Sequence, residues 1–322
     1  MEQGIKNSLK TTYDSMPFKE RFKRDWHNTC KAIWKNRVKY LFIAPFFTVF
    51  FIFTVCPVII SIFFSFTNFN MMEMPDFVGF DNYYRMFMAD DLFVKSLGNT
   101  LMFAMIVGPG GYIISLVMAW FLNELPVKVR VFFTVLLYAP SLAGGMTGTF
   151  KLLFSSDAQG WLNAWLIKWG IITEPIRYFE NETYVVWLII LVILWGSLGI
   201  SFLSFIGGLQ GIGREYYEAA AIDGIRNRWQ ELWYVTLPLM KPQLLFGAVM
   251  SITGAFGIGS VVTGLAGNPS VNYVAHTVMQ HLEDYGTIRF EMGYSSAIAT
   301  VLFFIMLFLN QFIQKIINKV GE

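Results

Sequence analysis

The sequence predicts an all-α membrane protein with six transmembrane helices. Of its 322 residues, 55% are hydrophobic and only 14% are charged, and the mean hydropathy is +0.50. Soluble domains use roughly 25% charged residues. The apolar residues also fall into long blocks, which is the pattern of segments that lie in lipid. These three observations together indicate a multi-pass membrane protein.

Six apolar blocks are long enough to cross a bilayer, which takes about 20 helical residues each. Pro45, Pro57, Pro109 and Pro140 lie inside blocks, where neighbouring helices can satisfy the freed carbonyl groups. Glycine recurs in the second, fourth and fifth blocks, and small residues let helix backbones approach closely. The six predicted spans cover residues 41–66, 100–122, 131–154, 185–206, 244–265 and 295–317.

The distribution of Lys and Arg predicts the orientation. These residues are concentrated in residues 1–40, in the loops after the second and fourth spans, and in the C-terminal tail. The positive-inside rule therefore places both termini in the cytoplasm. We divide the chain into a basic cytoplasmic tail (1–40), a transmembrane domain (41–317) and a short cytoplasmic tail (318–322).

The charge also bears on partners. A net charge of +2 gives no field that would attract nucleic acid. The basic segment 19–39 carries Trp26 and Trp34 and is expected to lie as an amphipathic helix on anionic lipid. His276 and His281 are five residues apart, which is wrong for one helix face, and no metal site is expected there.

The loop between the fourth and fifth spans, residues 206–242, has a pattern of its own. Residues 214–223 predict a short helix, with alanines for helix propensity, and Gly224 is placed to end it in a left-handed conformation. A second short helix is expected over residues 229–234. Pro238 and Pro242 suit the entry to the next span. The loop is therefore expected to be a compact helix–turn–helix joined firmly to two spans.

This loop resembles the EAA loop of ABC importer permeases. One difference is an extra residue between Gly224 and Leu237, near residues 225–227, where a turn can absorb it. Other segments are similar to the carbohydrate branch of these permeases: residues 77–83, 99–100, 262–269 and 293–297. The residues that match the EAA loop are Glu218, Ala219, Ala220, Asp223, Gly224, Val235, Leu237 and Pro238.

The resemblance implies a type I ABC importer permease fold in the bacterial inner membrane. It implies a translocation subunit for a sugar, most simply an oligosaccharide, that works with a second permease, two ATP-binding subunits and an extracytoplasmic solute-binding protein. The chain has no Gly-x-x-x-x-Gly-Lys-Ser/Thr loop, so ATP and Mg are expected on the partner subunits and no enzyme activity on this chain. Glu218 to Gly224 would sit in a cleft of one ATP-binding subunit, with Glu218 holding the loop by hydrogen bonds.

Two alternatives stay open at this point. One is an importer permease for another solute, such as a peptide or a glycerophosphodiester. The other is a secondary transporter, which would use ionisable residues inside the membrane. The predicted spans have few such residues near their centres, which argues against the second alternative.

The resemblance also implies a substrate pathway midway along the helices before and after the loop. An aromatic ring and hydroxyl groups suit a sugar, although Trp195 could equally pack in the bundle and the serines could bond their own helix. The candidate pathway residues are Trp195, Gly196, Ser197, Ile200, Ser251, Ala255 and Ile258.

Overall fold

The computed structural model describes residues 26–27, 31, 34–142 and 146–318. Most of the predicted amphipathic tail at 19–39 therefore lies outside the described residues. The chain divides into two compact units, residues 1–60 and 61–322. Within the described residues the regular structure is helical, apart from one isolated β-bridge between Thr67 and Phe77.

From Arg37 onward, the described part of the first unit is one long helical segment that continues to Phe64. Helix α3 (Arg37–Phe50) runs through a π-helical turn, η1 (Phe51–Val55), into α4 (Cys56–Phe64). The turn falls just before Pro57, which has no N–H to donate to the preceding turn. The whole segment Arg37–Phe64 is 28 residues long and is apolar enough to span a membrane. It matches the first predicted span.

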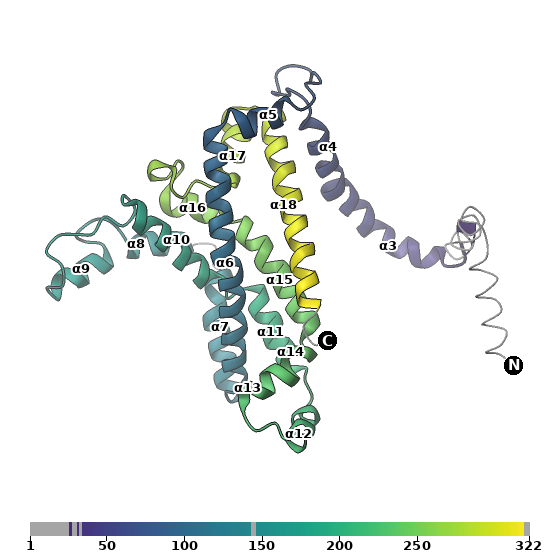
Figure 1. Ribbon diagram of the computed structural model, residues 1–322, viewed down its shortest axis with the longest axis vertical. Coiled ribbons are helices and arrows are strands. Elements are labelled where there is room, and N and C mark those ends of the chain that lie inside the picture. The colour runs from purple at the N-terminus through teal and green to yellow at the C-terminus, as the bar shows by residue number, and fades with distance from the viewer. Residues whose placement is uncertain (1–25, 28–30, 32–33, 143–145, 319–322) are drawn as a thin grey trace. The chain divides into compact units, whose positions relative to one another are not determined.

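The second unit is built around α6 (Asp91–Asn123), which packs against three other helices (Figure 1). These are α10 (Glu182–Gly196), α11 (Ile200–Gln210) and α15 (Lys241–Phe256). Helix α18 (Met292–Asn318) packs on α15. The remaining apolar helices are α7 (Val127–Leu142), α8 (Met146–Leu153) and α16 (Gly259–Ala266).

Four helical segments are long and apolar enough to cross a membrane, and up to six if two bent pairs each form one span. The described residues of each predicted span are mostly helical, but the fifth span differs from the prediction. Residues 244–265 were expected to be continuous, whereas the helix breaks between Phe256 and Gly259 into α15 and α16. The fourth predicted span is likewise interrupted between Gly196 and Ile200.

Short elements close the end of the bundle that lies opposite α12 (Arg214–Ile222), as Figure 1 shows. They are α5 (Asp81–Met88), η3 (Val271–Tyr273), α17 (Val278–Glu283) and η4 (Asp284–Ile288). Polar side chains hold them together. The amide of Asn82 donates to the backbone oxygens of Ser65 and Thr67, at 2.9 and 2.8 Å.

Asn99 and Thr100 make similar links from α6. The Asn99 amide donates to the backbone oxygens of Tyr273 and His276, both at 3.0 Å. The Thr100 hydroxyl accepts from the backbone N–H of Val278 at 2.9 Å. Two of the segments that carried the family resemblance, 77–83 and 99–100, therefore have a structural role, because their polar side chains fix loops far away in the sequence.

Candidate functional site: the α12 hairpin and a cavity between helix breaks

We call residues 214–239 the α12 hairpin. Its first helix, α12, ends at Ile222, and Gly224 follows with a φ of +96°. The backbone N–H of Ile225 donates to the oxygen of Ala220 at 3.0 Å, and that of Gly224 to Ala221 at 3.3 Å. This pair of bonds is a Schellman motif. The predicted left-handed end of the helix at Gly224 is confirmed.

The second arm of the hairpin is longer than predicted. Helix α13 (Arg228–Glu231) continues through a π-helical turn, η2 (Leu232–Thr236), into α14 (Leu237–Leu239). Asn227 caps it, because its side chain accepts from the backbone N–H of Gln230 at 2.8 Å. This arm then meets α15 at an angle of 82°. The bend lies at Met240, which is fully buried.

The hairpin is tied together and to the core of the unit. The hydroxyls of Tyr217 and Thr236 lie 3.1 Å apart, which links α12 to the second arm. At the C-terminal end of α6, Glu124 pairs with Arg228 at 3.1 Å. The rings of Trp120 and Trp229 lie 5.1 Å apart beside that pair. The hairpin is therefore anchored at α6 as well as at α15.

The predicted hairpin residues fall into two groups. Glu218, Ala219, Asp223 and Gly224 are exposed, and the nearby Ile222 side chain is 87% exposed. Ala220 is buried, whereas Leu237 and Pro238 are half-buried. One face of α12 is therefore exposed, whereas Ala220 on the same helix packs against the rest of the unit.

Glu218 forms an ion pair within its own helix. Its carboxylate pairs with Arg214 one turn earlier in the same helix, at 3.0 Å. The Schellman bonds use backbone atoms alone, so Gly224 needs no side-chain support. The role of Glu218 in holding the loop in a cleft of an ATP-binding subunit stays a prediction.

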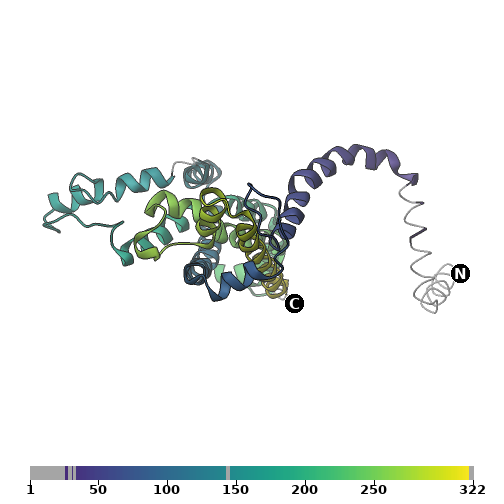
Figure 2. The ribbon, with the colours of Figure 1, turned by 90° about the horizontal axis from the view of Figure 1, so that it is seen from above.

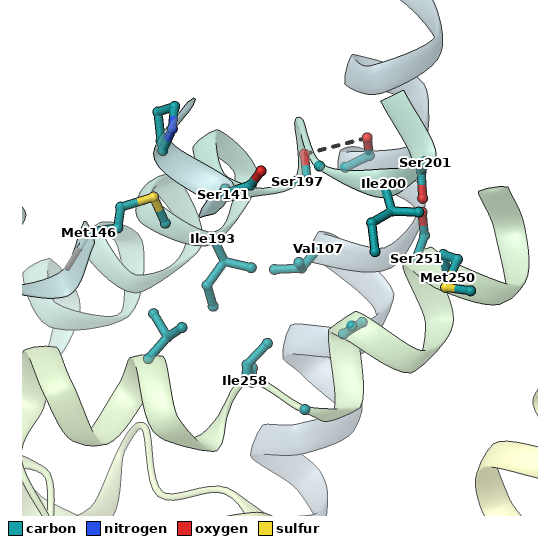
Figure 3. Close-up of a pocket in the computed structure, with 18 of the residues that line it drawn as sticks. Val107, Ser141, Met146, Ile193, Ser197, Ile200, Ser201, Met250, Ser251 and Ile258 are labelled. Carbon is teal, nitrogen blue, oxygen red and sulfur yellow. Dashed lines mark hydrogen bonds between the residues drawn. The ribbon is translucent and has the colours of Figure 1, made fainter. Parts of the chain in front are cut away.

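A cavity of about 630 Å³ lies between the helix breaks of the second unit. Figure 3 shows side chains converging on it from α6, α7, α8, α10, α11 and α15. Six of the seven predicted pathway residues line it: Gly196, Ser197, Ile200, Ser251, Ala255 and Ile258. Their role as a pathway remains a prediction. The structure brings them to one place.

The two breaks give the cavity its walls. At the first break, the Ser197 hydroxyl donates to the backbone oxygen of Leu194 at 2.6 Å. A side chain at Gly111 would put its Cβ 2.7 Å from the Cβ of Ser197, so glycine lets α6 approach this break closely. At the second break, Gly257 lines the cavity between α15 and α16. Helix interruption thus exposes backbone and small side chains to the cavity.

Trp195 is the exception among the pathway candidates. It lies on α10 next to Gly196, is 50% exposed, and does not line the cavity. Successive residues on a helix point about 100° apart, so the neighbours Gly196 and Ser197 can face the cavity when Trp195 does not.

The sequence-based reasoning missed the contribution of the third span. Tyr138, Pro140, Ser141 and Met146 also line the cavity, and Tyr138 is the aromatic ring among the lining residues. The available signal was Pro140 followed by Gly144 and Gly145 in the sequence, a combination that favours a helix interruption. No charged side chain is present among the described residues that line the cavity.

This arrangement defines the class of protein: a multi-pass membrane transport subunit with a cavity among its helices and a helical hairpin at one end. Residues 109–320 match the family described as the binding-protein-dependent transport system inner membrane component, and the chain belongs to that family. It is an ABC transporter permease of the inner membrane.

Related permeases are similar to this chain over most of its length. A probable ABC transporter permease protein of Bacillus subtilis, YesP, is 33% identical over 84% of this chain and 87% of its own. The arabinooligosaccharides transport system permease protein AraP of the same organism is 32% identical over 85% and 86%. The lactose transport system permease protein LacF of Rhizobium radiobacter is 31% identical over 83% and 89%.

Two solved structures share the fold. One is a bacterial ABC transporter involved in the import of the acidic polysaccharide alginate, with a TM-score of 0.75, 19% identity, and coverage of 92% of this chain and 100% of that chain. The other is an alginate transporter in complex with an alginate pentasaccharide-bound periplasmic protein, with a TM-score of 0.72, 22% identity, and coverage of 91% and 99%.

Proposed function

We propose that this chain is the translocation subunit of an ATP-driven importer of uncharged oligosaccharides, with six spans and both termini in the cytoplasm. The observation that carries the proposal is the cavity between the two helix breaks, because it is uncharged, contains hydroxyl groups, and is lined by α15, the helix that directly follows the α12 hairpin. The names of the sugar permeases among the relatives support the same substrate class.

The cavity has the chemistry that a neutral sugar requires. Ser141, Ser251 and Ser260 contribute hydroxyl groups, and the ring of Tyr138 offers a surface for the C–H face of a sugar. A peptide or a phosphodiester carries formal charges, which would need opposite charges nearby in a low-dielectric site. A secondary transporter would need an ionisable residue for ion coupling. The described residues that line the cavity include no Asp, Glu, Lys, Arg or His, so the cavity meets neither requirement.

The α12 hairpin is suited to transmit force from an ATP-binding subunit. Its exposed residues, Glu218 to Gly224, would occupy a cleft on that subunit. The second arm reaches the buried Met240, which packs in one cluster with Phe202 and Phe205 of α11 and Leu244 of α15. Closure of two ATP-binding subunits, which bind ATP and Mg, would move α11 and α15 as a rigid body and so rearrange the cavity.

Two further partners follow from this function. A second permease would complete the pathway, as the resemblance to ABC importer permeases implies. A solute-binding protein would deliver the sugar at the end of the bundle opposite α12. The solute-binding protein is supported by the family description, which names binding-protein-dependent transport, and by the periplasmic protein in the second alginate transporter structure.

The test is ATPase stimulation of the complete complex in lipid nanodiscs. Binding protein loaded with neutral oligosaccharides of different composition and length should raise ATP hydrolysis severalfold above the unloaded binding protein. Peptides and glycerophosphodiesters serve as controls. Stimulation by a charged solute but by none of the neutral oligosaccharides would contradict the assigned substrate class.

A further inference from the structure

Three tryptophans lie along one side of α9 (Trp161–Lys168), between the third and fourth predicted spans. Trp161, Trp165 and Trp169 are 73%, 62% and 65% exposed. Their spacing of four residues, at about 100° per residue, puts them with Lys168 within one arc of the helix surface. We call these four residues the tryptophan face. The proposed function uses none of them.

Hydrogen bonds fix the direction in which this face points. Asn163 on the other side of α9 is fully buried. Its amide donates to the backbone oxygens of Ser155 and Ile176, both at 3.1 Å, and its side-chain oxygen accepts from the N–H of Ile176 at 3.1 Å. The helix therefore cannot rotate to bury its tryptophans without breaking buried hydrogen bonds.

The chain on either side restricts where α9 can lie. Seven residues separate it from α8, and α10 begins at Glu182. Both neighbouring helices belong to segments long and apolar enough to cross a membrane: α10 begins a candidate span, and α8 is part of a bent pair with α7. In the two views α9 lies at the edge of the bundle beyond α8 and α10, on the side away from α18 (Figures 1 and 2). Tyr184 and Trp187 in the first two turns of α10 are also exposed aromatic residues.

We propose that the tryptophan face docks into the headgroup region of the bilayer and anchors α9 in the membrane interface. Tryptophan is enriched at this depth because its ring is apolar and its N–H needs a polar partner. Lys168 supplies the positive charge that anionic headgroups attract. Close packing against another transmembrane helix would favour small residues at this position. The inference does not depend on which solute is transported.

The test uses the complete complex in nanodiscs, with Cys30 and Cys56 replaced by Ser and a polarity-sensitive fluorophore on Trp165→Cys. Labels on Trp161→Cys and Trp169→Cys repeat the measurement at independent positions. Met74→Cys is the control, because Met74 is 87% exposed in a loop between Glu73 and Asp76. Each variant is first checked for assembly with its partners.

We expect lipids brominated near the headgroup to quench the label at position 165 at least threefold more strongly than the label at position 74. Aqueous iodide should show the opposite order. Three results would overturn the proposal. Equal iodide quenching at positions 165 and 74 would mean that the face is solvated, and protection from both quenchers would mean contact with the second permease. A change in the quenching at position 165 on adding the loaded binding protein would mean that this protein or its sugar docks there.

Discussion

The Nε2 atom of His281 lies 3.0 Å from Oδ2 of Asp90, and both side chains are almost fully buried. The same carboxylate oxygen accepts from the Tyr294 hydroxyl at 2.7 Å, and Oδ1 caps α6 by accepting from the N–H of Phe93 at 2.9 Å. One carboxylate therefore joins α6, α17 and α18. Burial alone raises the pKa of Asp90, but these hydrogen bonds hold it below its usual value.

Removing this carboxylate should destabilise the end of the bundle opposite α12. Asp90→Ala deletes a helix cap and leaves two buried donors without their acceptor, which costs about 2–4 kcal/mol. We expect the thermal unfolding midpoint of the purified protein to fall by several degrees. Asp91→Ala is the matched control, because Asp91 is exposed and adjacent. An equal effect of both substitutions would contradict the role of Asp90.

Acid should weaken the same region through the two histidines. Burial is the main cause that lowers the pKa of His276, to about 4, and it also lowers that of His281. Both rings are neutral in the folded protein and bind a proton more readily when it is unfolded. The neutral rings therefore make their full contribution to the free energy of unfolding above the unfolded pKa near 6.5. This contribution declines as the pH falls toward the folded pKa, by up to about 3 kcal/mol for His276.

The measurement is the unfolding midpoint between pH 7.5 and pH 4.5 in wild type and in His276→Gln. The variant should show a flatter pH dependence, because the group that gains a proton on unfolding is gone. A profile as steep as that of wild type would assign the acid sensitivity to other groups. Protonation of Asp90 should reduce the stability only at lower pH. Its pKa is depressed in the folded protein, so its stabilising effect is lost only as the pH falls below about 4, the usual pKa of an aspartate.

Gly224→Val should uncouple ATP hydrolysis from uptake while leaving membrane insertion intact. A Cβ at this position would meet no other atom within 4 Å, so the penalty comes from the φ of +96° alone, about 1–2 kcal/mol. Gly224→Asn should be milder, because Asn tolerates the left-handed region. Gly207→Ala is the control in equally open space without a positive φ. Coupled uptake in Gly224→Val at the wild-type level would refute this requirement.

Ser251→Phe should block transport by filling the cavity. Ser251 lines it from α15, whereas Thr253 on the same helix is exposed and does not line it. We expect sugar uptake into proteoliposomes to drop at least tenfold for Ser251→Phe and to change little for Thr253→Phe. Equal uptake by the two variants would place the pathway elsewhere.

Much of this molecule could be predicted from sequence, because its strongest signals are local. The apolar blocks located the spans, and Gly224 after an alanine-rich helix located the turn with the positive φ. The helix breaks at 197–199 and 257–258 could not be predicted, since they depend on close approach to α6 and on contacts between distant helices. The wall contributed by Tyr138 was missed because the signal of Pro140, Gly144 and Gly145 was not used, and Trp195, predicted as a pathway residue, does not line the cavity.

The network around Asp90 also lay beyond sequence reasoning. Asp90 lies 191 residues before His281 and 204 before Tyr294, a separation that follows no motif spacing. His276 and His281 were assessed only as metal ligands, because helix periodicity says nothing about a carboxylate brought in from another segment. A polar cluster of this kind is defined by tertiary packing.

The central claim is that the exposed surface of α12 contacts an ATP-binding subunit. Ile222→Cys, at the most exposed apolar position of α12, can be tested by disulfide crosslinking to single cysteines on that subunit in native membranes. We predict a crosslink at Ile222→Cys whose yield changes when ATP is added, and none at Met74→Cys. The absence of any crosslink from Ile222→Cys in an assembled, ATP-hydrolysing complex would contradict this account.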